Sequence, residues 1–149
     1  MNALPHPESA TPISVRRWLN NRRCVGRARR DLRDVLTAWG MAELTDPAEL
    51  VLSELVTNAV RHARHPLGRE IETRYERADG GVRIEVHDAN DQWPELQKAD
   101  EEAETGRGLM LVDAITGQRW GASKREGVGK LVWALVTADG SGQWPDLGE

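Results

Sequence analysis

The spacing of apolar residues changes along this chain, and that change constrains the fold more than any other feature. Between residues 22 and 64, apolar side chains recur at helical spacing, which is typical of helices that bury one face. Beyond residue 70 they alternate with polar residues, as they do in half-buried strands. Because the helical and alternating segments are segregated, the pattern predicts an α+β fold.

Turn residues set the expected element boundaries. Gly40 is placed to end the first helix, and Asp46 with Pro47 to begin the second as N-cap and first-turn residue. The expected elements are a strand at 14–20, helices at 22–39, 46–64 and 109–115, and hairpins pairing 71–77 with 82–87 and 118–123 with 130–137. They predict a two-layer sandwich, a mixed but mainly antiparallel sheet with about three helices on one face.

Length and composition bound the class of protein. A chain of 149 residues has room for one domain, and its single cysteine, Cys24, excludes an internal disulfide and a thiolate zinc site. With neither a secretory signal nor an apolar membrane span, the chain is expected to be cytoplasmic. Residues 1–13 and 138–149 have the composition of a flexible lead-in and tail around one domain at 14–137.

Charge is distributed unevenly along the chain. The stretch from residue 16 to 33 carries eight arginines, whereas residues 88–104 are acidic. Such a basic stretch is either a nucleic-acid footprint or a solvated helix face. The net charge of −4 and the lack of a nucleic-acid motif favour the solvated face. We therefore expect no direct nucleic-acid partner, and a nucleic-acid binder stays an alternative.

A polar stripe on the second helix is the first candidate site. Glu54, Asn58 and His62 follow one another at intervals of four residues, on the side opposite the apolar face. A carboxylate and a carboxamide stacked in this way suit a general base and a Mg²⁺ ligand. The alternative is an ordinary solvated face of an amphipathic helix.

Two further candidates lie beyond that helix, on either side of a long polar loop. Gly106-Arg107-Gly108 precedes the expected third helix, where glycines and unpaired N–H groups can approach a phosphate. The alternative is that the two glycines only mark the boundary between the loop and the helix. Asp88 ends a strand and can accept a hydrogen bond from an exocyclic amine such as that of adenine, or can form an Asx turn instead. The loop between them, residues 88–105, is too long for an ordinary connection and is typical of a functional lid.

These three clusters, in this order, resemble the GHKL ATP-binding superfamily of gyrase, heat-shock chaperone, histidine kinase and mismatch-repair proteins. ELVTNAVRHA is similar to the N box, VRIEVHDANDQWP to the first glycine box and GRGLMLV to the second. The branch that the chain resembles is the anti-sigma factor serine/threonine kinases and their small single-domain actinobacterial relatives. This resemblance extends from Ser14 to Val136 and implies the Bergerat, histidine kinase-like ATPase fold.

The resemblance implies a role for each matching residue, with ATP and Mg²⁺ as cofactors. Glu54 would be the general base, Asn58 the Mg²⁺ ligand and Asp88 the acceptor for the adenine amine. The remaining nucleotide-binding residues, at the phosphate end, would be Gly106, Arg107, Gly108 and Leu109. His62 is expected to be structural. The implied partners are a STAS-type anti-sigma factor antagonist, which would be phosphorylated on serine, a sigma factor, and a second copy of the chain in a homodimer.

One departure from the superfamily keeps alternatives open. Ala89, Asn90 and Asp91 stand where the first glycine box usually has glycines, and Pro94 follows them. A catalytically weak or inactive nucleotide-binding module that sequesters a sigma factor or another regulator is therefore the main alternative to a kinase. The detached catalytic half of a histidine kinase ranks last, since no helical hairpin for a phosphoacceptor histidine is expected outside residues 14–137.

Overall fold

The structure, a computed structural model, describes residues 12–61, 70–78, 80–88, 103–124 and 129–138. Their elements, in chain order, are β1 (Ile13–Leu19), α1 (Arg23–Ala38), the short 3-10 helix η2 (Ala42–Leu44), α2 (Thr45–Arg61), β2 (Glu70–Ala78), β3 (Gly81–Asp88), α3 (Ala103–Thr116), β4 (Trp120–Lys124) and β5 (Lys130–Thr137). The α+β class is confirmed. The predicted lead-in and tail lie almost entirely outside the described residues, and those domain boundaries stay predictions.

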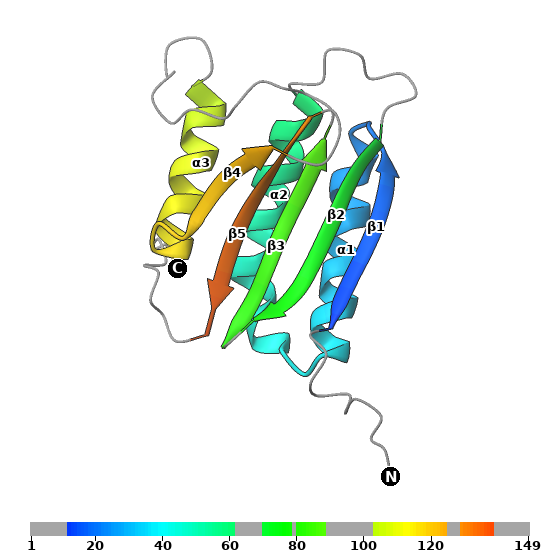
Figure 1. Cartoon of the computed structure of the whole chain (residues 1–149), viewed down its shortest axis with the longest axis vertical. Coiled ribbons are helices and arrows are strands. Elements are labelled where there is room, and N and C mark those ends of the chain that lie inside the picture. Colours follow the sequence, from blue (N-terminus) through cyan, green and yellow to red (C-terminus); the bar gives the residue numbers. More distant parts are fainter. Residues whose placement is uncertain (1–11, 62–69, 79, 89–102, 125–128, 139–149) are drawn as a thin grey trace.

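The strands form one sheet in the order β1-β2-β3-β5-β4 (Figure 1). Every described pairing is antiparallel, in line with the predicted mainly antiparallel sheet. β5 follows all the other elements in the chain and yet lies inside the sheet, between β3 and β4. The outer strands of the described sheet are therefore β1 and β4.

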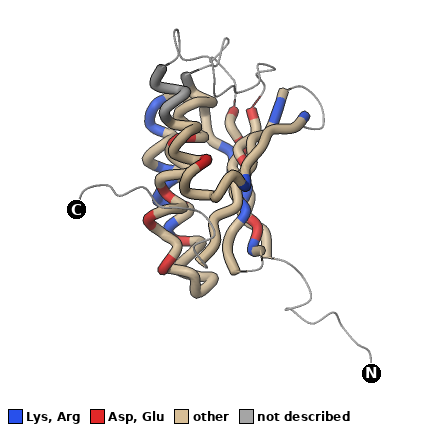
Figure 2. Tube along the Cα trace, turned by 90° about the vertical axis from the view of Figure 1, so that its left-hand side faces the viewer, with Lys and Arg blue, Asp and Glu red and all other residues tan. Residues whose placement is uncertain are grey.

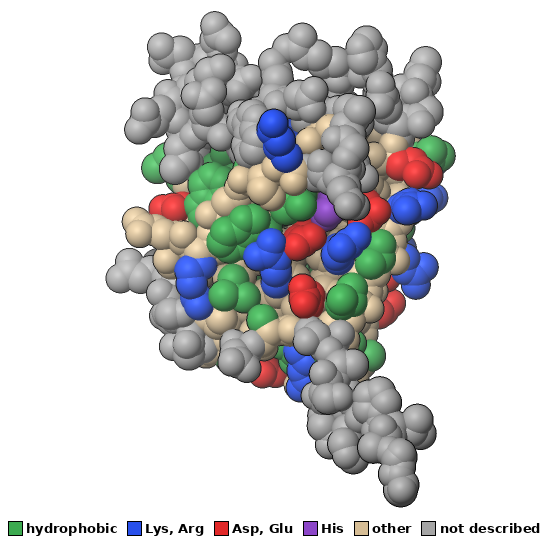
Figure 3. All heavy atoms as spheres, viewed as in Figure 1, with side chains coloured by type: hydrophobic (Ala, Val, Ile, Leu, Met, Phe, Trp, Pro, Cys, Tyr) green, Lys and Arg blue, Asp and Glu red, His purple; other side chains and the backbone are tan. Residues whose placement is uncertain are grey.

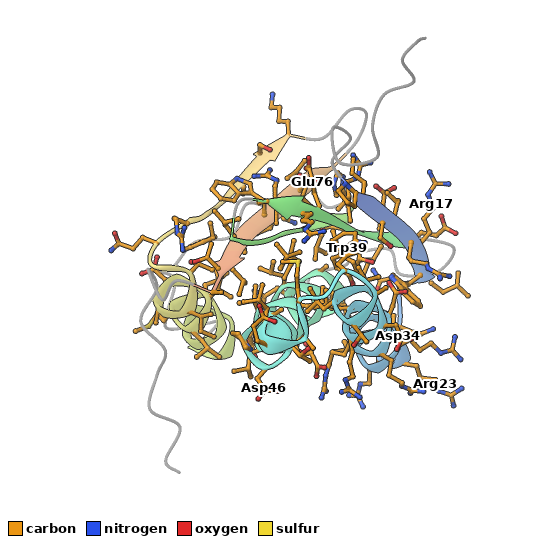
Figure 4. All side chains as sticks on the ribbon, turned by 90° about the horizontal axis from the view of Figure 1, so that it is seen from below. Arg17, Arg23, Asp34, Trp39, Asp46 and Glu76 are labelled. Atoms are coloured by element: carbon orange, nitrogen blue, oxygen red, sulfur yellow. The ribbon has the colours of Figure 1, made fainter. Side chains whose placement is uncertain are left out.

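The three α-helices lie side by side on one face of the sheet and leave the other face open (Figures 1 and 2). α2 is the middle helix and packs against α1 on one flank and α3 on the other. Figure 4 shows the two layers from below, with Arg23 of α1 directed away from the sheet. The two-layer sandwich is as predicted.

The core fills the space between the layers because both layers present apolar side chains to it. Alternate residues of β3 are buried against the helices, as expected for a strand with one covered face, and these are Val82, Ile84 and Val86. α2 contributes the largest share from the helical layer, with Ala48, Val51, Leu52, Leu55, Val56 and Ala59. Within the described residues, no helix is both long and apolar enough to span a membrane.

Helix ends agree with the sequence in one place and differ in another. Gly40 follows α1 with a φ of 73°, a left-handed conformation that glycine adopts easily, so the predicted helix end is confirmed. Asp46 is not an N-cap, because α2 begins at Thr45, directly after η2. The aspartate lies in the first turn, where its charge still complements the helix dipole.

Candidate functional site

The middle helix α2 positions the polar residues that the sequence singles out. Its apolar face is buried against the sheet, and residues on its two flanks lie beside the neighbouring helices α1 and α3. Glu54 and Asn58, one turn apart, are half-buried. The predicted stripe is therefore not a solvated face opposite the core, at least at Glu54, whose carboxylate turns toward α3.

Glu54 lies directly against the backbone of α3 at Gly108. A Cβ built at Gly108 would overlap the Oε1 atom of Glu54, and would stand 3.2 Å from its Cδ and 3.7 Å from its Cγ. The Glu54 carboxylate can occupy this position only because residue 108 has no side chain. Glu54 and Gly108, which the sequence prediction brings together, thus lie in direct contact, and no hydrocarbon separates them.

The helix that carries the glycine pair begins earlier than predicted. α3 starts at Ala103, so Gly106 and Gly108 lie inside the helix and not before it. The N–H groups of the N-cap and of the first three helical residues have no partner within an α-helix, and in the described part of α3 these residues are 103–105. Gly106 is the fourth residue of α3, where the backbone N–H donates within the helix, and the absence of a side chain at Gly108 makes room for the Glu54 carboxylate.

The remaining predicted residues are placed as follows. The side chain of Leu109 is fully buried in the hydrophobic core, so packing explains the presence of a leucine at this position. His62 and the side chain of Arg107 lie outside the described part of the chain, as do residues 89–91 and Pro94. Of the described residues, no group of three or more His, Cys, Asp or Glu side chains can hold a metal ion. Asn58, an amide, is the metal ligand that the sequence predicts.

Asp88 is buried and forms an ion pair that the sequence did not predict. Its side chain faces the helical layer, in line with Val82, Ile84 and Val86, and only 4% of the residue is exposed. Lys130 is its register partner on β5, and the lysine Nζ lies 3.2 Å from both carboxylate oxygens. The alternative of an Asx turn involves residues 89–90, which lie outside the described residues.

Lys130 is the functional candidate that the sequence patterns missed. A signal exists, because Lys130 falls in the buried set of an alternating strand with Val132, Ala134 and Val136. A lysine on a core face is almost never buried without a partner. What the sequence does not give is the register between β3 and β5, which sets the lysine opposite Asp88.

The site residues gather at one end of the molecule. The end of β3, the start of β5 and the start of α3 all lie at the top of Figure 1. α2 runs toward the same end, and it contacts both α3 and β3. The residues that carry a carboxylate, an amide, the first N–H groups of α3 and a buried ion pair thus lie toward one end of the two layers.

The open face of the sheet has a separate network of charges. Acidic and basic side chains are interleaved with hydrophobic ones there (Figure 3). Glu85 contacts His87 Nε2 and Arg83 Nε, each at 2.8 Å. The hydrogen bond to His87, and then that to Arg83, outweigh burial and lower the pKa of Glu85 to about 2. Burial raises the pKa of Glu72, but the hydrogen bond from Arg74 and the charge of His87 outweigh it, so that pKa is lowered too.

The arginine-rich helix α1 forms ion pairs with its neighbours. Arg33 binds Glu49 of α2 with its Nε 2.7 Å from Oε2, and Arg29 lies 3.7 Å from the same carboxylate. Arg16 of β1 contacts Asp31 at 3.3 Å. Part of the basic stretch therefore joins α1 to α2 and to β1. The sequence favours a solvated helix face and does not predict these ion pairs.

Comparison with known families supports the architecture. The profile of the histidine kinase-like ATPase domain matches residues 19–135, which include Glu54, Asp88, Gly108 and Lys130. Comparison with curated protein sequences gives no match. The antiparallel five-stranded sheet with three helices on one face is the arrangement expected of that domain. The chain therefore belongs to the histidine kinase-like ATPase domain family, and this membership implies that it binds ATP.

Proposed function

We propose that this protein is an ATP- and Mg²⁺-dependent serine/threonine protein kinase of the anti-sigma factor type. Its substrate would be a small STAS-type antagonist protein, and it would control transcription by binding a sigma factor in alternation with that antagonist. The observation that carries the proposal is the contact between the Glu54 carboxylate and the Gly108 backbone. It joins the predicted general base to the predicted phosphate end of the site, in a chain of the ATPase family.

Glu54 is suited to act as the general base. ATP would supply a phosphoryl group for transfer, a reaction that depends on positioning and charge stabilisation more than on covalent chemistry by the protein. The Glu54 carboxylate would accept the proton of the attacking serine hydroxyl. Its half-buried place between α2 and α3 limits the directions in which it can point, and Gly108 keeps that place open.

Asn58 would hold the metal ion. Mg²⁺ prefers oxygen ligands, takes few of them from protein, and completes its shell with water and phosphate oxygens. The Asn58 amide oxygen is such a ligand, and it lies one helical turn beyond Glu54 on α2. The base and the metal ligand would then be fixed to one rigid element.

The opposite side of the site would bind the nucleotide itself. Asp88 would accept a hydrogen bond from the exocyclic amine of adenine. The first N–H groups of α3, those of residues 103–105, would donate to phosphate oxygens, helped by the helix dipole. Arg107 would add a positive charge at the same helix end.

The experiment that tests the proposal is phosphorylation of candidate antagonists with labelled ATP. We expect phosphoserine on one antagonist, dependent on Mg²⁺, and its loss in Glu54→Gln, which keeps the shape of the side chain. Glu49→Gln is the matched control, because Glu49 lies on the same helix but pairs with the arginines of α1. This control should phosphorylate normally. Calorimetric titration of ATP, with and without Mg²⁺, tests the nucleotide site without knowledge of the partner.

The Glu54→Gln variant also separates the kinase from the alternative. A kinase requires the carboxylate as proton acceptor, whereas a module that only binds nucleotide and sequesters a sigma factor does not. If Glu54→Gln keeps its full regulatory effect on the partner while no antagonist is phosphorylated by the unmodified protein, the proposal of a kinase is wrong. ATP binding would survive that outcome.

A further inference from the structure

The buried ion pair between Asp88 and Lys130 is a feature that the proposed chemistry leaves partly unexplained. Lys130 is 6% exposed and Asp88 4%. One ammonium lies 3.2 Å from both oxygens of the carboxylate, across a register pair of β3 and β5. Both side chains lie on the face of the sheet toward the helices, next to the register pair Val86 and Val132.

Stability is a poor explanation for this pair. Desolvating two charges offsets most of their attraction, and well-packed apolar residues in such positions are often as stable or more so. The strands already provide the apolar alternative, since Val86 opposes Val132 one step further into the core. A second apolar pair would simply extend that core. Two charges kept at the nucleotide end of the sheet therefore point to a ligand.

We propose that Lys130 is a specificity-determining residue that reads the adenine base together with Asp88; this inference rests on the nucleotide site proposed above. The Watson–Crick edge of adenine carries the N6 amine, a donor, next to ring N1, an acceptor. Asp88 would accept from N6, and Lys130 would donate to N1. The acceptor and the donor already lie side by side on neighbouring strands.

The donor and acceptor capacities allow this exchange. An ammonium has three donors and a carboxylate has about four acceptor sites, so each group can contact the other and one atom of the base at the same time. Binding of the base would keep each charged group hydrogen-bonded while part of their mutual contact is replaced. Hypoxanthine presents a carbonyl oxygen and an N–H at the same two positions, in the reverse order, and would not match the assigned pairing.

The first arm of the test uses the unmodified protein and changes one atom of the ligand. In 1-deaza-ATP the N1 acceptor is replaced by C–H, while the N6 amine is kept. We expect 1-deaza-ATP to bind about tenfold or more weakly than ATP, the loss typical of a hydrogen bond to a charged group. ITP is expected to bind more weakly than ATP as well. Calorimetry measures all three affinities.

The second arm removes the lysine. In Lys130→Met we expect weaker ATP binding and the same affinity for ATP and 1-deaza-ATP, because the group that senses N1 is gone. Lys124→Met is the matched control, since Lys124 is exposed, lies opposite Lys130 on β4 and carries the same charge. The control should keep the preference for ATP.

The outcomes separate this inference from the proposed function. Equal affinities of the unmodified protein for ATP and 1-deaza-ATP would overturn the role of Lys130 while leaving the kinase proposal intact. Tighter ATP binding by Lys130→Met would also overturn it, because the lysine would then compete with adenine for Asp88. Failure of ATP itself to bind would overturn the proposed function, and this inference with it. If Lys130→Met does not fold, the comparison of analogues on the unmodified protein still decides.

Discussion

Replacing Gly108 by alanine tests the geometry of the site most directly, because two effects of known size oppose each other there. Gly108 lies inside α3, where alanine is favoured over glycine by about 0.5–1 kcal/mol. The new Cβ would overlap the Glu54 carboxylate, which must leave its present rotamer. A side chain forced away from its preferred rotamer costs roughly 0.5–1.5 kcal/mol. The two contributions nearly cancel, so we expect a change in unfolding free energy close to zero.

Gly26 in α1 provides the matched control. It is also a helical glycine, but nothing lies within 4 Å of a Cβ built there. Gly26→Ala should therefore stabilise the protein by about 0.5–1 kcal/mol. Urea unfolding followed by the fluorescence of the six tryptophans measures both variants. The contrast between the two alanines, about 1 kcal/mol, is the quantity to compare.

A double-mutant cycle with Glu54→Ala isolates the contact. Without the Glu54 side chain, Gly108→Ala should give the same stabilisation as Gly26→Ala, so the coupling energy should be about 1 kcal/mol. A coupling below about 0.3 kcal/mol, the usual limit of additivity, would refute the placement of Glu54 against α3. The single Gly108→Ala variant should meanwhile lose phosphoryl transfer by roughly 100-fold, because the base is displaced while the fold is kept.

Three further predictions concern the fold. Glu85 has its pKa lowered to about 2 from 4.5, so its contribution to stability should be complete above about pH 5 and vanish toward pH 2. At pH 7 the free energy of unfolding of Glu85→Gln should be lower than that of the unmodified protein by about 1 kcal/mol, allowing for screening. When unfolding is measured at decreasing pH, this difference should disappear between pH 4.5 and 2. A difference that stays constant with pH would contradict the prediction. Trp18→Phe removes the 2.9 Å hydrogen bond from Trp18 Nε1 to Oγ1 of the fully buried Thr73. The free energy of unfolding in urea should fall by about 1–3 kcal/mol. In the double variant with Thr73→Val, the loss should be smaller than the sum of the two single losses. Leu52→Ala, in the fully buried centre of α2, should cost about 2–5 kcal/mol, and a loss below 1 kcal/mol would contradict its place in the core.

The sequence predicts the elements of this fold because period and turn chemistry are local properties. The change from helical to alternating spacing gives the two layers, and Gly40 gives the end of α1. The start of α3 was predicted six residues too late, at Leu109 and not at Ala103, because the first turns of that helix are polar and include two glycines. A helix without an apolar repeat at its beginning has no local signal for its first residue.

Only those parts of the candidate site that short sequence motifs identify could be predicted. Glu54, Asn58 and Gly108 are identified by the motifs that contain them, and the contact of Glu54 with Gly108 depends on α2 and α3 being neighbours, which the resemblance implies. The Asp88–Lys130 pair depends on the register of two strands separated by α3 and β4. Such a register is set by packing of the whole sheet and not by any short segment.

The place of β5 has a consequence for how the chain reaches its native state during synthesis. A strand that emerges after all the other elements must enter between β3 and β4, so the backbone edge of β3 stays unpaired until residues 130–137 have left the ribosome. Unpaired apolar edges are the surfaces through which nascent chains associate wrongly. Folding of this domain should therefore be completed late and in one cooperative step, and Lys130 reaches Asp88 in that same step.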